Sequence, residues 1–129
     1  LGAPALHEVL GRSHVLVVPS RDSAVWSEQW GRVATEAMMT GRPVITSDAG
    51  ELPALVGPGQ VTFRQNDHRA LAERIQALCD NPARLQEMAD DAYRRSWNLR
   101  PDVLAVHLND FWHEARRFYE ERPRATGGT

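Results

Sequence analysis

Short apolar runs alternate with helical patterns along this chain of 129 residues. Residues 14–18 form one such run, which ends at Pro19, and residues 44–46 form a second, while residues 61–63 are expected to be a brief third strand. Runs of this length without regular polar alternation are typical of strands buried on both faces of a sheet. Strands separated by helices are joined by right-handed crossovers, so the pattern predicts a parallel sheet with helices on both faces.

Each expected helix has a recognisable start or stop signal. Pro4 lies in the first turn of the first helix, where its missing N–H costs nothing, and Gly41 ends the second. Asp67 is an N-cap residue, Pro82 precedes the fifth helix, and Pro101 opens the last one. The expected helices are residues 3–11, 31–40, 51–56, the segment between Asp67 and Asn81, residues 83–96 and residues 101–121.

Helical periodicity also predicts which side chains face inward. On the fourth and fifth helices we expect an apolar face, whereas the arginine pairs are expected on solvated faces. The inward set is Leu71, Ile75, Leu78, Leu85, Met88, Ala89 and Ala92, and the arginine pairs are Arg94-Arg95 and Arg116-Arg117.

The strands predict an α/β fold that is only part of a Rossmann-like domain. A complete sheet of this kind has about five or six strands, and only three are visible here. The chain also begins at Leu1 rather than Met and shows no signal peptide, so it reads as a fragment. We expect residues 1–121 to form the back part of a three-layer domain with several C-terminal helices, and residues 122–129 to be a disordered tail.

Composition excludes several classes of function. A net charge of -2 and a pI near 6.2 give no electrostatic footprint for nucleic acid. No apolar run approaches the roughly 20 residues that span a bilayer. Cys79 is the only cysteine, which rules out an internal disulfide and predicts a cytoplasmic protein, with peripheral membrane association left open for a longer form. The histidines lack zinc-ligand spacing, so no metal or other cofactor is expected.

The segment from Trp26 to Val44 contains the residues best suited to bind a ligand. In open parallel sheets ligands bind beyond the carboxyl ends of the strands, which here bracket this segment. If Gly31 opens a helix, the amides of Gly31, Arg32 and Val33 lack intrahelical acceptors and form an anion site suited to a diphosphate.

Two carboxylates and two indole rings accompany that helix start. Glu28 before the helix and Glu36 within it can accept hydroxyl groups of sugars, and Trp26 and Trp30 can stack on sugar rings. Each also has an ordinary structural explanation, because a Glu before a helix complements the dipole and a Trp is commonly a core residue. The sequence has nine glutamates, so their spacing alone decides nothing. The joint order of these residues carries the functional interpretation.

That order resembles the C-terminal domain of GT-B retaining glycosyltransferases, specifically glycosyltransferase family 4. The resemblance covers roughly residues 1–121, with Trp30 in place of the usual Phe. The matching motifs are Pro19-Ser20, Glu28-Gln29-Trp30-Gly31, Glu36-Ala37-Met38, Gly41-Arg42-Pro43-Val44 and Ser47-Asp48-Ala49-Gly50.

The resemblance implies transfer of a hexose-like sugar from a nucleotide-diphosphate donor with retention at the anomeric carbon. It gives Glu28 the catalytic position, in contact with hydroxyls of the donor sugar. No metal is implied, because the leaving diphosphate itself is thought to stabilise the transition state. The remaining implied contacts are Gln29, Trp30 and Gly31 with the sugar, Gly31, Arg32 and Val33 with the diphosphate, and Glu36 with the ribose.

The same resemblance places the acceptor domain and other phosphate-binding residues before Leu1, so this chain alone is expected to be inactive. The loop from Arg21 to Ser27 is longer than the commonest family version. Two other functions stay open. One is a non-catalytic nucleotide- or anion-binding module. The other is a fragment that associates with itself through an exposed sheet edge or through the apolar stripe of the C-terminal helix, residues 103–118.

Overall fold

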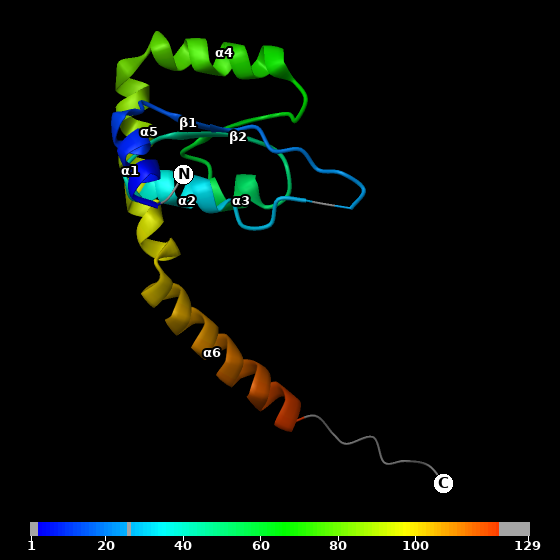
Figure 1. The fold of residues 1–129 in the computed structure, drawn as a ribbon. Helices are drawn as coiled ribbons and strands as arrows, with labels where there is room; N and C mark the ends of the chain where they lie inside the picture. The colour runs from blue at the N-terminus through cyan, green and yellow to red at the C-terminus, as the bar shows by residue number, and fades with distance from the viewer. Residues whose placement is uncertain (1–2, 26, 122–129) are drawn as a thin grey trace. The chain divides into compact units, whose positions relative to one another are not determined.

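The computed structural model describes residues 3–25 and 27–121. The expected tail, residues 122–129, and Trp26 lie outside the described residues. The chain divides into two compact units, Leu1–Trp97 and Asn98–Thr129. The elements in chain order are α1 Ala3–Arg12, β1 Leu16–Val18, α2 Arg32–Met39, β2 Val44–Ser47, α3 Leu52–Val56, β3 Val61–Phe63, α4 His68–Cys79, α5 Pro82–Ser96, the 3-10 helix η1 Trp97–Leu99 and α6 Pro101–Glu120 (Figure 1).

The three strands form one parallel sheet in the order β1-β2-β3, which confirms the predicted α/β fold. Leu16 pairs with Val44, and Ile45 pairs with Val61. The expectation of strands buried on both faces is correct for β2, where every residue is buried, but wrong for β1. Only Val18 of β1 is buried, because within the described sheet β1 pairs with a strand on one side only.

Helices cover both faces of the sheet in the first unit. Figure 1 shows α4 on one side of the strands and α2 and α3 on the other. Ile45 and Phe63 pack with Leu78 of α4 and Met88 of α5 in one buried cluster. Burial of such side chains contributes about 1.5–3 kcal/mol each, so this cluster fixes α4 and α5 on the sheet.

One predicted core residue is misplaced. Ile75 of α4 is 36% exposed, although it shares a helical face with the inward Leu71 and Leu78. The sheet beneath α4 has three strands, with β3 at its edge, and the apolar cluster there includes Leu71 and Leu78 but not Ile75. Helical periodicity predicts which face of α4 points towards the sheet, but it does not predict how far the sheet extends beneath that face.

A buried glutamine joins the amino ends of two strands to α5. Gln60 is 6% exposed, and its Oε1 accepts the N–H of Val44 at 3.0 Å. Its Nε2 donates to the carbonyl of Met88 and to the Asp91 carboxylate, both at 2.9 Å. These bonds satisfy polar groups that would otherwise be buried without a partner.

Of the two residues in the Arg94-Arg95 pair, Arg95 binds another helix rather than lying on a solvated face. Arg95 donates from Nε to the carbonyl of Leu55 at 2.7 Å and from its terminal nitrogen to that of Ala54 at 2.6 Å. Carbonyls near the end of a helix lack intrahelical donors, and a cation is favourable there. The expected solvated face is therefore wrong for Arg95, which holds α3 against α5.

The second unit consists mainly of α6. One side of this helix carries large apolar side chains that are well exposed to solvent. They are Leu108, Phe111, Trp112 and Phe118, whereas the exposed Val106 lies on the opposite side of the helix. Among the described helices, none combines the length and the apolar character needed to cross a membrane.

Candidate donor site

The site is built around the start of α2. Gly31 is the N-cap of this helix and adopts a left-handed conformation with φ of 50°. An added Cβ would lie 2.6 Å from Leu55 Cδ2 and 2.7 Å from Leu52 Cδ2. Glycine is therefore favoured by the backbone angle, and a Cβ would also displace the two leucine side chains of α3. The predicted helix start is confirmed, and α2 itself begins one residue later, at Arg32.

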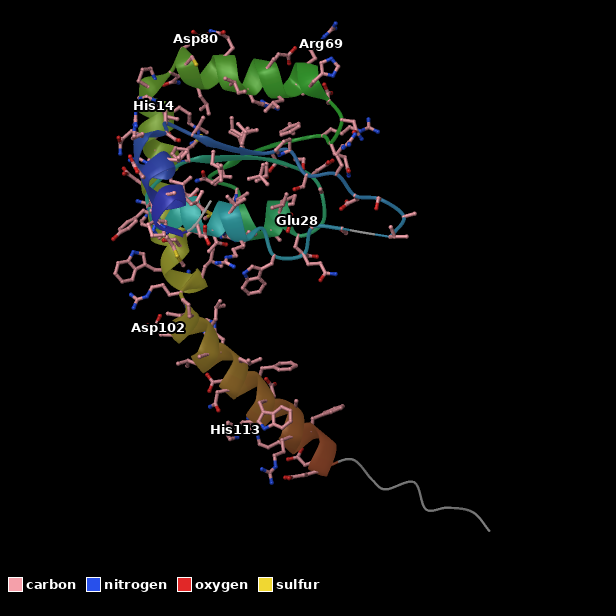
Figure 2. All side chains as sticks on the ribbon, viewed as in Figure 1. His14, Glu28, Arg69, Asp80, Asp102 and His113 are labelled. Atoms are coloured by element: carbon pink, nitrogen blue, oxygen red, sulfur yellow. The ribbon has the colours of Figure 1, made fainter. Side chains whose placement is uncertain are left out.

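Glu28 lies where that helix start meets the strand ends. Its Oε1 accepts the N–H of Gly31 at 3.0 Å, and its Oε2 accepts the Ser20 hydroxyl at 3.3 Å. The carbonyl of Ser20 in turn accepts the hydroxyl of Ser47, at the end of β2, at 2.6 Å. Figure 2 shows Glu28 in the loop before α2, on the side of the sheet where α2 and α3 lie. The carboxylate thus binds the N-cap residue of α2 at the carboxyl edge of the sheet.

The loop before α2 also forms an open pocket. Its volume is about 340 Å³, and Val25, Ser27, Glu28, Gln29 and Trp30 line it. The Trp30 side chain is 61% exposed, so its ring is not a core residue. Trp26, the other candidate stacking residue, lies outside the described residues. The structure therefore brings three candidate sugar-binding residues together around one pocket.

The helix α2 carries the other three candidate residues, which are Arg32, Val33 and Glu36. The helix geometry leaves the amides of Arg32 and Val33 without acceptors in the preceding turn, and Gly31 has no side chain to cap them. Glu36 lies one turn further along and accepts from Arg32 Nε at 2.9 Å. The Arg32 side chain is 83% exposed and that of Glu36 is 22% exposed. Glu36 is not among the pocket-lining residues, so it stands apart from the group around Glu28.

Asp22 is a polar residue of this region that sequence reasoning missed. It lies in the loop after β1, and its carboxylate accepts from Ser27 Oγ at 2.6 Å, from the Gly50 amide at 3.1 Å and from Gln65 Nε2 at 3.4 Å. The bonds from Ser27 and Gly50 hold the pKa of Asp22 below its ordinary value. Local sequence pattern gives no signal for it, because Gly50 and Gln65 lie 28 and 43 residues further along the chain.

Metal ligands are not grouped in this region. In residues 3–25 and 27–121, no three His, Cys, Asp or Glu side chains come together as a metal site requires. The expectation that no cofactor is needed stays a prediction.

Parallel strands alternating with helices, with a glycine-started helix at their carboxyl ends, define part of a Rossmann-like α/β domain. The family model described as Glycosyl transferases group 1 matches residues 2–95. The chain therefore belongs to the group 1 glycosyltransferases, a family of GT-B type.

Individual relatives agree with this family. The chain is 31% identical over 130 residues to a D-inositol 3-phosphate glycosyltransferase of Streptomyces coelicolor, which covers 99% of this chain and 27% of the relative. It is 36% identical over 112 residues to the protein of the same name from Rhodococcus opacus, with 85% of this chain and 24% of the relative covered. The chain thus spans well under half the length of these relatives.

A solved structure shows the same fold. The chain matches a sucrose-phosphate synthase from Thermosynechococcus elongatus with a TM-score of 0.70 and 28% sequence identity. The match covers 84% of this chain and 27% of that one. The arrangement of sheet and helices is therefore that of a glycosyltransferase domain.

Proposed function

We propose that the chain carries part of the donor site of a retaining, family 4 glycosyltransferase, which transfers a sugar from a nucleotide-diphosphate sugar to an acceptor. The observation that supports this most is the position of Glu28. Its carboxylate lines an open pocket and also accepts the amide N–H of Gly31 at the start of α2. A sugar in that pocket and a diphosphate at that helix start would be neighbours, as they are in a nucleotide sugar.

Glu28 is proposed to contact hydroxyls of the donor sugar. A carboxylate has about four lone-pair sites, and Gly31 and Ser20 use two of them. The remaining sites can accept hydroxyls with charge-assisted hydrogen bonds, which are stronger than neutral ones. Gln29 and Trp30 line the same pocket and are proposed to complete the contacts with the sugar.

The diphosphate is proposed to lie at the start of α2. The Gly31 amide already donates to Glu28, so the amides of Arg32 and Val33 carry most of this role. Negative charge develops on the diphosphate as the sugar leaves, and fixed N–H groups aimed at that charge stabilise the transition state. Gly31 contributes its lack of a side chain, which allows close approach.

Glu36 is proposed to bind the two ribose hydroxyls. In the structure it pairs with Arg32, which is strongly exposed. Exposed pairs of this kind contribute about 0–1 kcal/mol, so the ribose can displace the arginine at small cost. The released guanidinium can then approach the diphosphate, which is the type of anion that Arg binds well.

The acceptor is proposed to bind to residues outside this chain, because the chain spans 27% or less of the relatives named above. On this proposal the chain by itself binds donor without transferring sugar.

The test is a titration of the ¹⁵N-labelled chain, followed by NMR, with UDP-glucose, GDP-mannose and ADP-glucose, which differ in base. At least one is expected to shift the amides of Gly31, Arg32 and Val33. Glu36→Gln is expected to weaken binding about tenfold, since a carboxylate that accepts two hydroxyls loses half its acceptors.

Two controls separate ribose binding from general effects. The 2′,3′-dideoxy form of the bound nucleotide should bind wild type and E36Q with similar affinity, because both hydroxyls that Glu36 is proposed to contact are then missing. Glu87→Gln removes a comparable exposed ion pair, that of Glu87 with Arg84 at 3.2 Å, and should leave binding unchanged. If none of the three nucleotide sugars shifts the α2 amides, the proposed donor site is wrong.

A separate property, self-association, is proposed from the exposed apolar side of α6. Leu108, Phe111 and Trp112 lie within two turns on this side and are each more than half exposed. Contiguous apolar surface of this kind is typical of interaction sites.

A further inference from the structure

The loop between β1 and α2 has a defined position although it contains no helix or strand in its described residues. It begins at Pro19 and leads through Glu28 to Gly31, so it carries the pocket-lining residues. An irregular loop that presents binding groups needs contacts that fix it, because ordering each residue costs about 1–2 kcal/mol in backbone entropy. The hydrogen bonds of this loop therefore show what holds it.

Asp22 takes part in four of these bonds. Its carboxylate accepts from Ser27 within the loop, from the Gly50 amide after β2 and from Gln65 after β3. The Asp22 amide also donates to Gln65 Oε1 at 2.8 Å. One side chain thus connects the segments that follow all three strands.

Gly50, which binds the Asp22 carboxylate, is also in contact with the backbone of Glu28. An added Cβ at Gly50 would collide with the backbone carbonyl of Glu28, so the two backbones touch. That same carbonyl accepts the N–H of Glu51 at 3.0 Å. Because Asp22 binds the Gly50 amide, it fixes the turn against which the Glu28 backbone rests.

Gln65 has an anchor of its own. Its backbone N–H donates to Oδ1 of Asp48 at 2.7 Å, and Asp48 is the first residue after β2. The Gln65 side chain is thereby held at the end of the sheet, and its contacts with Asp22 connect the loop to that fixed point. Ser27 adds the shortest bond, one residue before Glu28.

We propose that Asp22 is a positioning residue for the donor sugar, which acts by holding the Ser27–Glu28 segment against the turns after β2 and β3. This inference rests on the proposed donor site. It separates two parts of that site, because the sugar contacts lie on the loop that Asp22 holds, whereas the amides for the diphosphate belong to α2, whose helical hydrogen bonds do not involve Asp22.

The first arm of the test measures the loop without any ligand. Amide hydrogen exchange of Gly50 and Glu51 is followed by NMR in the wild-type chain, Asp22→Ala, Asp22→Asn and the control Asp90→Ala. Asp90 is also an exposed acceptor of one side-chain bond, from Gln86 at 2.9 Å. We expect exchange about tenfold faster in D22A, a smaller change in D22N, which keeps one acceptor oxygen, and no change in D90A. A change below twofold at both amides in D22A would overturn the proposal.

The second arm compares a nucleotide sugar with its free nucleoside diphosphate, using whichever of UDP-glucose, GDP-mannose and ADP-glucose the wild type binds. In D22A the affinity for the nucleotide sugar should fall about tenfold while that for the diphosphate stays within twofold. Equal losses of both affinities would show a general structural effect and refute a positioning role. If the wild type binds none of the three, the proposed function fails, and the exchange arm alone still decides whether Asp22 holds the loop.

Discussion

The Glu28 carboxylate accepts the amide N–H of Gly31 at 3.0 Å, so the residue that faces the pocket also holds the N-cap residue of α2. The two roles can be separated by substitution. Glu28→Ala removes this hydrogen bond and should lower the free energy of unfolding by about 1 kcal/mol. Glu28→Gln keeps an acceptor oxygen for Gly31 and should change stability by less than about 0.5 kcal/mol. Urea denaturation measures both.

Binding gives the second half of this prediction. Both variants lose the charged acceptor for sugar hydroxyls, so both should bind the nucleotide sugar more weakly than wild type in the NMR titration, by about tenfold. A Glu28→Gln chain as unstable as Glu28→Ala would show that the carboxylate charge, and not hydrogen bonding, maintains the start of α2.

Three glycines provide a graded test of the backbone in this region. Gly50 has a φ of 50° and contacts the Glu28 carbonyl, Gly41 has a φ of 67° with free space around it, and Gly11 lies in α1 with free space and no unusual φ. Substitution by Ala should cost about 1–3 kcal/mol or more at Gly50, about 1 kcal/mol at Gly41, and should stabilise the chain by about 0.5–1 kcal/mol at Gly11.

Thermal or urea unfolding of the three Ala variants provides the measurement. The order of stability matters more than each value, since all three changes add the same methyl group. A G50A chain no less stable than G41A would mean that the contact with Glu28 gives way without cost, and the close packing of Gly50 on the loop would then not hold its position.

Much of this fold can be predicted from local sequence pattern. The strands, the glycine before α2 and the N-cap at Asp67, whose carboxylate accepts the Ala70 amide at 2.8 Å, all depend on residues close together in the chain. Period, turn chemistry and capping act over a few residues, and the sequence reports them directly. The position of Glu28 beside the helix start follows from the same short spacing.

Contacts between distant segments could not be predicted in this way. Three side chains form hydrogen bonds with residues 28 to 43 positions away in the sequence. They are Asp22, Gln60 and Arg95. Nothing in their own neighbourhood distinguishes them from ordinary polar surface residues. Ile75 shows the converse, since its helical pattern is correct but the extent of the sheet beneath it depends on the whole fold.

Gln60 should contribute strongly to stability because its bonds are buried. Gln60→Leu leaves the N–H of Val44 and the carbonyl of Met88 without these partners in the core. The Met88 carbonyl keeps its intrahelical donor in α5, so the Val44 N–H is the group left unsatisfied, and we expect a loss of about 1–3 kcal/mol in the free energy of unfolding. The control Gln86→Ala removes only an exposed bond to Asp90 and should change it by less than about 0.5 kcal/mol. Similar midpoints for both variants in urea would contradict the role given to Gln60.

The network around Asp22 should depend on pH in the acid range. Hydrogen bonds from Ser27 and then Gly50 lower the pKa of Asp22 in the folded chain from its usual value of 3.8. For a lowered carboxyl pKa, the stabilisation is fully present above the unfolded value and is lost as the pH falls through the folded value. Protection of the Gly50 amide from exchange, corrected for the intrinsic rate, should therefore be constant near neutral pH and fall below pH 3.8. In Asp22→Asn the same profile should lack this step, and a step that persists would assign it to another group.

The apolar side of α6 should drive association at high concentration. Phe111 and Trp112 are about two-thirds exposed, at 65% each, so burying them against a second copy removes apolar surface from water at about 25 cal/mol per Å². We expect the sedimentation coefficient of the chain to rise with concentration and that of the double variant Phe111→Gln/Trp112→Gln to stay constant.

The control Val9→Gln changes a half-exposed side chain on α1 and should behave as wild type. All three chains should have nearly the same unfolding midpoint at low concentration, because none of these side chains is buried in the monomer. Concentration-dependent sedimentation that survives the double substitution would move the contact away from α6 and towards the sheet edge at β1, where one side of the strand has no partner in the described sheet.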